Sequence, residues 1–188
     1  MKHISFSLIL GFISVVLPAQ VALTPHFEAL LEQAGLEFIT PLEARYKPAR
    51  MDRDPFQHYD YAMRSRLEKM EVRYIVKPYE ADDPLCEFPV ISATRLVTHL
   101  ATNEEDYVIS EREIAPDILA KDFNADWGRQ YFFHPKPHFA DTRHCELLAL
   151  HKAGRGTAFV LFLFNEPSRE LGNRFYALRF EEKKAEEQ

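Results

Sequence analysis

An unbroken apolar run near the C-terminal end of the chain, TAFVLFLF at Thr157–Phe164, limits the fold more than any other feature. A strand with one face in water alternates polar and apolar residues, whereas a strand buried on both faces is apolar throughout. The run follows a glycine-containing connection and an earlier apolar segment, Cys145–His151, an arrangement typical of a β-hairpin. We therefore expect a central strand in a sheet whose two faces are both covered by helices.

Helical spacing of apolar residues recurs in three segments: Thr24/Pro25–Leu36, Val90–Asn103 and Pro116–Trp127. Thr24 can cap the first helix, and Gly35 supplies its stop. The third helix is expected to begin at Pro116 rather than at the capping-box pattern Ser110-x-x-Glu113, because a helix from Ser110 would contain Pro116. Gly128 is its predicted terminator.

Further strands are expected at three places: Gln57–Ser65, Glu71–Val76 and Arg174–Phe180. In the second of them, Val72, Tyr74 and Val76 alternate with residues of the opposite face. These strands and helices together predict an α+β fold, an antiparallel β-sheet flanked by helices.

The N-terminus has the pattern of a cleavable secretory signal peptide. Lys2 precedes an apolar run from Ile4 to Leu17, and the small residue Ala19 precedes Gln20. A transmembrane anchor needs about 20 apolar residues, so this run is short for one. We expect residues 1–19 to be the signal peptide, 20–180 a single α/β domain, and 181–188 a charged, disordered tail. The expected location is the periplasm or the extracellular space, with no stable membrane anchor after cleavage.

Composition excludes several classes of protein. The 188 residues are 46% hydrophobic and carry a formal net charge of -6, which is ordinary for a globular protein and gives no basic footprint for nucleic acid. Nucleotide-binding glycine loops and the G-x-S-x-G elbow of serine hydrolases are missing. We predict no catalytic residues and no cofactor.

Element order resembles the PsbP-like α/β/α sandwich, in which an antiparallel sheet lies between helical layers. Three motifs are similar to those of uncharacterised exported bacterial proteins: VRYIVKP at Val72–Pro78, FNADWG at Phe123–Gly128 and LALHKAG at Leu148–Gly154. The resemblance to PsbP-like domains implies an accessory or binding role rather than an enzyme. Fold-level analogy does not determine function.

The segment ADWGRQYFFHPKPHFADTRHC concentrates aromatic, cationic and imidazole side chains. Flat apolar rings next to cationic donors suit a ligand that carries a carboxylate or phosphate. The predicted binding residues are Asp126, Trp127, Arg129, His134 and His138. The alternative for this segment is an ordinary aromatic core with charged residues at its exposed edge.

A metal site is the other interpretation of the same segment. His134, His138, Asp141 and His144 supply enough donors for zinc. Pro135 and Pro137 forbid the regular helix that would place His134 and His138 on one face. We predict no metal.

Cys86 and Cys145 form an even pair in a chain expected to be exported. A disulfide between them and two separate buried thiols are both open at this stage.

A basic connection contains Lys47, Pro48, Arg50 and Arg53. We interpret it as a solvated loop rather than as an anion-binding strip.

These features favour an exported bacterial protein of unknown activity, a non-enzymatic binding or accessory module of the cell envelope with an unknown protein or small-molecule partner. The alternative is a small exported hydrolase, with metal assistance at the histidine-rich segment. A structural envelope component is a third class. The sequence does not reveal the oligomeric state.

Overall fold

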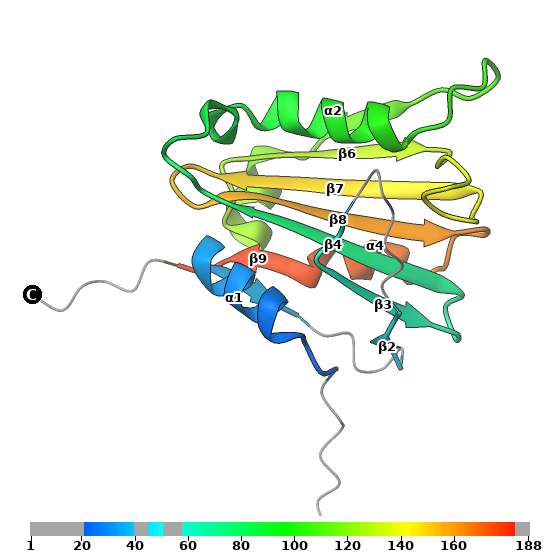
Figure 1. Ribbon diagram of the computed structural model, residues 1–188, viewed down its shortest axis with the longest axis horizontal. Coiled ribbons are helices and arrows are strands. Elements are labelled where there is room, and N and C mark those ends of the chain that lie inside the picture. Colours follow the sequence, from blue (N-terminus) through cyan, green and yellow to red (C-terminus); the bar gives the residue numbers. More distant parts are fainter. Residues whose placement is uncertain (1–20, 40–44, 51–57, 183–188) are drawn as a thin grey trace, which may run out of the picture.

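Strands run side by side through the centre of the protein (Figure 1). The computed structural model describes residues 21–39, 45–50 and 58–182, and within them a seven-stranded antiparallel sheet has the order β2-β3-β4-β8-β7-β6-β5. Its strands are β2 (Lys47–Pro48), β3 (Tyr61–Ser65), β4 (Met70–Pro78), β5 (Ser110–Glu113), β6 (Trp127–Phe133), β7 (His144–Lys152) and β8 (Gly156–Phe164). The predicted α+β class is therefore confirmed.

Strand β8 is the central strand that the apolar run predicts. It pairs with β4 on one side and with β7 on the other, and all nine of its residues are buried. Ala158, Val160 and Phe162 face one apolar cluster, while Phe159 and Leu161 face a second one. The sheet thus has two buried faces, as expected for a strand without polar alternation.

Helix α1 (Pro25–Ala34) covers the first face, where it packs against β4. Thr24 Oγ1 accepts a hydrogen bond from the backbone amide of Phe27 at 3.3 Å, and Gly35 ends the helix with a left-handed φ of 58°. The predicted caps are confirmed, and the helix stops two residues before Leu36 because Gly35 turns the chain into β1 (Leu36–Phe38). The alternation predicted for β4 is confirmed as well, since Val72, Tyr74 and Val76 belong to this face.

Helix α2 (Pro89–Leu100) covers the opposite face, where it contacts β7. Its buried residues are those of the predicted stripe: Ala93, Leu96, Val97 and Leu100. They join Phe159 and Leu161 of β8 in the second apolar cluster. Helices therefore cover both faces of the sheet.

The predicted third helix is shorter than expected. The chain forms one turn at α3 (Pro116–Ile118), continues as a π-helical segment, η3 (Leu119–Phe123), and ends at Asn124, which has a φ of 48°. Asparagine tolerates this left-handed conformation, so the helix stops before Trp127. Trp127 and Gly128 instead begin β6, a strand that is not among those predicted from the sequence. Ser110–Glu113 forms β5, so its capping-box pattern is accidental as expected.

The predicted strand Arg174–Phe180 is also only partly correct. Helical turns occupy α4 (Leu171–Arg174) and η4 (Phe175–Ala177), and only β9 (Leu178–Phe180) is extended. Strand β9 pairs with β1 rather than with the large sheet. The remaining short helix is η2 (Pro84–Glu87), which leads into α2.

The predicted signal peptide, residues 1–19, and residues 183–188 of the predicted tail lie outside the described residues. In the part of the chain that the structure describes, no helix combines the length and the apolar character needed to cross a membrane.

Candidate functional site

Strand β6 carries or flanks the predicted binding residues and spreads them along its length. Asp126 and Trp127 lie at its start, whereas His134 and His138 follow its end. Seven extended residues span roughly 23 Å. Asp126 and His134 therefore cannot contact one small ligand together, and the five residues do not form a single site.

Asp126 stabilises the β7–β8 hairpin. Its Oδ2 accepts a hydrogen bond from the backbone amide of Ala153 at 2.9 Å, and its own amide donates to the carbonyl of His151 at 2.9 Å. Lys152 Nζ lies 4.0 Å from Asp126 Oδ1. The carboxylate is thus engaged by the turn that joins the two central strands.

Trp127 and Arg129 do lie together on β6, with the Arg129 guanidinium 6.0 Å from the Trp127 ring centroid. Two glutamates of the neighbouring strand β5 neutralise this cation. Arg129 Nη2 is 2.7 Å from Glu113 Oε1, and Nη1 is 3.4 Å from Glu111 Oε2. The hydrogen bond with Glu113 raises the pKa of Arg129. An anionic ligand would have to compete with both carboxylates there.

Two of the histidines after β6, His134 and His144, lie in a cluster of aromatic rings. The His134 ring lies 3.9 Å from the Tyr107 ring and 5.0 Å from the His144 ring, between centroids. Burial, and then the neighbouring His134, lower the pKa of His144. His138 lies in an exposed part of the β6–β7 connection. Among residues 21–39, 45–50 and 58–182, no group of three or more His, Cys, Asp or Glu is placed to hold a metal ion.

The two cysteines are free thiols at opposite ends of the sheet. Cys145 is opposite Leu163 in the register, whereas Cys86 Sγ lies 4.0 Å from the carbonyl of Pro78, which is opposite Gly156. Leu163 and Gly156 are seven residues apart on β8, roughly 23 Å, whereas a disulfide needs Cα atoms within about 7 Å. The disulfide that the sequence left open is therefore not formed in this fold.

A different group of side chains surrounds a cavity of about 830 Å³ at the β2–β3 edge of the sheet. We call it the basic cleft. It is lined by Arg45, Lys47, Pro48, Ala49, Arg50, Arg64, Arg66 and Leu67. Five of these eight residues are cationic, on a chain whose formal net charge is -6. This local concentration of positive charge is what an anionic ligand requires.

The cations of the basic cleft have few carboxylate partners. Within the described residues, only Arg64 among them makes an ion pair, with Glu71, whose Oε2 accepts from Arg64 Nε at 2.9 Å. Lys47 lies directly opposite Arg64 in the register of β2 and β3. Like charges opposite each other on neighbouring strands destabilise a sheet. An anion bound between them would relieve this repulsion.

Near the cleft, the backbone has a positive φ at an arginine and at a lysine, residues that rarely adopt this conformation. Within the described residues, the non-glycine residues with positive φ are Arg45 (51°), Lys69 (50°) and Asn124 (48°). Asparagine occupies this region readily, whereas arginine and lysine do so at a cost. Arg45 lines the cleft, and Lys69 lies in the turn between β3 and β4. Strain of this kind is concentrated at ligand-binding sites.

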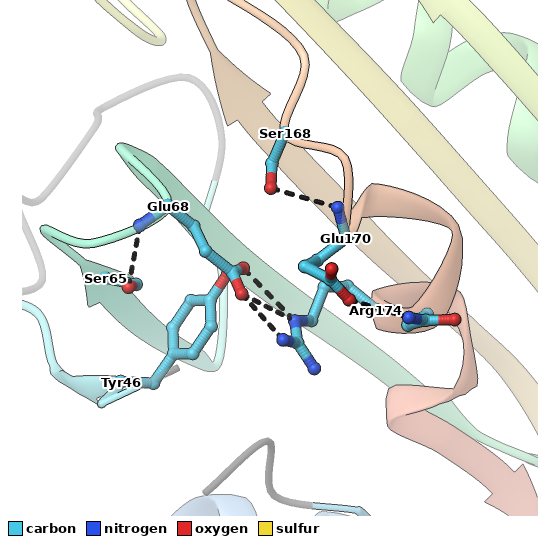
Figure 2. Close-up of polar contacts among 7 residues, drawn as sticks. Tyr46, Ser65, Glu68, Ser168, Glu170 and Arg174 are labelled. Carbon is cyan, nitrogen blue, oxygen red and sulfur yellow. Dashed lines mark hydrogen bonds and ion pairs between the residues drawn. The ribbon is translucent and has the colours of Figure 1, made fainter. Parts of the chain in front are cut away.

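A buried ion pair between Glu68 and Arg174 lies next to the residues that line the cleft (Figure 2). Arg174 Nη2 of α4 donates to Glu68 Oε1 at 2.6 Å, and both side chains are 7% exposed. The Tyr46 hydroxyl donates to Glu68 Oε2 at 2.8 Å. Burial and the Glu68 carboxylate raise the pKa of Tyr46, so this hydroxyl stays protonated. Tyr46 lies between Arg45 and Lys47, and Glu68 follows Leu67, so the Tyr46–Glu68 hydrogen bond joins the two chain segments that line the cleft.

The interpretation of the basic connection as a solvated loop is partly wrong. Lys47–Pro48 forms β2, whose pairing with β3 brings Arg45, Lys47 and Arg50 next to Arg64 and Arg66. Arg53 lies outside the described residues. The signal in the sequence is two cationic segments, RYKPAR and RSRLEK, that surround the short strands.

Comparisons with models of protein families, with curated proteins and with solved structures find no match for this chain.

Proposed function

We propose that the protein is an exported, non-enzymatic binding module of the bacterial cell envelope, and that it binds a small anionic ligand in the basic cleft. The observation that carries the proposal is the lining of the cleft. Arg45, Lys47, Arg50 and Arg66 surround one cavity without a described carboxylate partner. The signal-peptide pattern and the element order that resembles PsbP-like binding modules support the location and the class.

The shape of the cleft favours a small molecule over a flat protein surface. Its volume of about 830 Å³ lies in the range of ligand pockets, about 300–1,000 Å³. Arginine predominates among its cations, and the planar guanidinium binds phosphate and carboxylate through paired hydrogen bonds. The neutralised Arg129 on β6 offers no comparable charge.

Thermal unfolding with inorganic phosphate tests this proposal. Phosphate should raise the unfolding midpoint relative to chloride at equal ionic strength, because a ligand that binds only the folded state stabilises it. The double variant Lys47→Gln/Arg66→Gln should lose this increase while its circular dichroism spectrum stays unchanged, since both side chains are exposed.

Arg129→Gln is the matched control, because it removes one cation from the other candidate surface. It should retain the phosphate-induced increase. If Arg129→Gln abolishes the increase and the double variant keeps it, the ligand binds at β6 and the proposal for the cleft is wrong.

A further inference from the structure

A second cavity adjoins the basic cleft. Its volume is about 480 Å³, and we call it the turn cavity. Arg64 and Arg66 line both cavities and thus lie between them. The turn cavity is lined by Arg64, Ser65, Arg66, Lys69, Met70, Glu71, Arg73, Ala140, Asp141, Thr142 and Leu163. An arrangement with shared arginines allows one molecule to reach both cavities.

The carboxylates of the turn cavity do not cancel its positive charge. Glu71 Oε2 accepts from Arg64 Nε at 2.9 Å, and Glu71 Oε1 accepts from Arg73 Nε at 2.8 Å. Two guanidinium groups therefore neutralise this one carboxylate. The other charged residues that line the cavity are one acid, Asp141, and two cations, Arg66 and Lys69. The cavity keeps an excess of positive charge.

Arg73 is a fixed charge rather than a ligand-binding side chain. Its Nη1 donates to the carbonyl of Phe139 at 2.6 Å, and its guanidinium lies 4.6 Å from the Tyr59 ring centroid. Its side chain is 11% exposed. Lys69, in contrast, is exposed and has no described carboxylate partner. Lys69 and the shared Arg66 are therefore the exposed cations of the turn cavity without a described carboxylate partner, and of these two only Lys69 does not also line the basic cleft.

The backbone of Lys69 supports a role for its side chain. Its φ of 50° is a conformation in which asparagine or glycine is less strained than lysine. Arg45, on the other side of the shared arginines, has the same kind of backbone, with a φ of 51°. The two strained cations thus belong one to each cavity.

Resting on the proposed function, we infer that the ligand carries at least two phosphate groups, one bound in the basic cleft and one in the turn cavity, with Arg64 and Arg66 between them. Two linked groups bind more tightly than one, because the second group binds at a high effective concentration. A free oligophosphate and a bisphosphorylated lipid headgroup share this chemistry.

Titration calorimetry with orthophosphate and tripolyphosphate at constant ionic strength tests the inference. Tripolyphosphate should bind the wild-type protein at least about tenfold more tightly than orthophosphate. Lys69→Asn should weaken tripolyphosphate binding about fivefold and leave the binding of orthophosphate in the basic cleft unchanged. Lys47→Gln, in the basic cleft, should weaken both. Lys121→Gln on η3 lines neither cavity and should change neither.

The outcomes separate the inference from the proposed function. If Lys69→Asn leaves tripolyphosphate binding unchanged while Lys47→Gln weakens both anions, the two-cavity inference is wrong and the cleft proposal stands. If neither anion binds, or Lys47→Gln has no effect, the cleft proposal itself fails. If orthophosphate binds as tightly as tripolyphosphate, the second phosphate has no site.

Vesicles that contain a lipid with two phosphomonoester groups identify the source of the ligand. A lipid headgroup would be supported if the protein binds these vesicles at a lower phosphate concentration than it needs for free tripolyphosphate, and if this binding depends on Lys69. Tighter binding of free tripolyphosphate would support a soluble oligophosphate. Tighter, Lys69-independent binding of a single-stranded oligonucleotide would contradict the inference, because a nucleic acid would then be the preferred anion.

Discussion

Glu68 and Arg174 are 106 residues apart in the chain and form an ion pair with little exposure to water. Removing one charge of such a pair leaves the other buried without compensation. Glu68→Gln should therefore lower the free energy of unfolding by about 3 kcal/mol. Tyr46→Phe, which removes one hydrogen bond to the carboxylate, should cost about 2 kcal/mol. Urea denaturation followed by circular dichroism measures both.

Glu37→Gln provides the surface comparison. Glu37 Oε2 lies 3.7 Å from Arg179 Nε, and the two side chains are 57% and 34% exposed. Solvent screens such pairs, so this substitution should cost less than about 1 kcal/mol. Equal losses for Glu68→Gln and Glu37→Gln would show that the buried pair stabilises the fold no more than a surface pair does.

A substitution at Arg45 should affect the free energy of unfolding and phosphate binding differently. Asparagine tolerates the left-handed backbone better than arginine, so Arg45→Asn should leave the free energy of unfolding unchanged or raise it by about 0.5–1 kcal/mol. The same substitution should reduce the stabilisation by phosphate. Urea denaturation with and without phosphate measures the two effects.

Arg50→Asn is the control for this prediction. Arg50 also lines the cleft but is not among the described residues with positive φ. It should reduce the phosphate effect without the gain in stability. A clear loss of stability in Arg45→Asn would contradict the strain interpretation.

At the scale of elements, the β7–β8 hairpin depends on Gly156. Its φ is 122°, and a Cβ atom there would collide with the carbonyl oxygen of Lys77 on β4. Gly156→Ala should therefore lower the free energy of unfolding by about 3 kcal/mol or more, because both backbone strain and a steric clash arise. Gly154 has a φ of 67°, and a Cβ atom added there would have no neighbour within 4 Å. Gly154→Ala should cost only about 1 kcal/mol, and equal costs in thermal unfolding would refute the clash.

Elements with a local cause could be predicted from the sequence. The caps of α1, the alternation in β4 and the apolar run of β8 depend on residues within a few positions of one another. Strand β6 could not be predicted, because its pairing with β7, such as Trp127 opposite His151, needs a distant partner. The helical turn at Leu171–Arg174 was missed for a similar reason, since Arg174 is buried through its contact with Glu68.

On mild acidification, the titration of two histidines should act against the stability of the whole molecule. Burial lowers the pKa of His144 and His151, so both favour the neutral form in the folded state. As the pH falls below about 6.5, the unfolded chain binds protons first, and the free energy of unfolding decreases. His144→Gln should reduce this pH dependence between pH 7 and pH 5.5, as measured by urea denaturation.

The difference between the wild-type and His144→Gln curves of unfolding free energy against pH removes the contributions of Asp60 and Glu146. Burial raises the pKa values of these two carboxyl groups. An unchanged slope in His144→Gln would show that this histidine does not couple to folding.

The candidate site illustrates the same limit at the scale of the whole molecule. The clusters RYKPAR and RSRLEK are visible in the sequence, but only the pairing of Lys47 with Arg64 brings them together. Asp126 and His134 of the aromatic segment were predicted to share one binding site, but the length of β6 separates them. Separation in sequence is a poor guide to distance in both cases, since strand pairing and strand length decide which side chains meet.

Backbone amide chemical shifts recorded during a phosphate titration test whether an anion binds in the basic cleft. The largest changes should fall on residues 45–50 and 64–69, around the basic cleft and the β3–β4 turn. Changes on β5 and β6 should be small. Largest changes around Trp127 and Arg129, with none at Lys47 or Arg66, would contradict binding in the basic cleft.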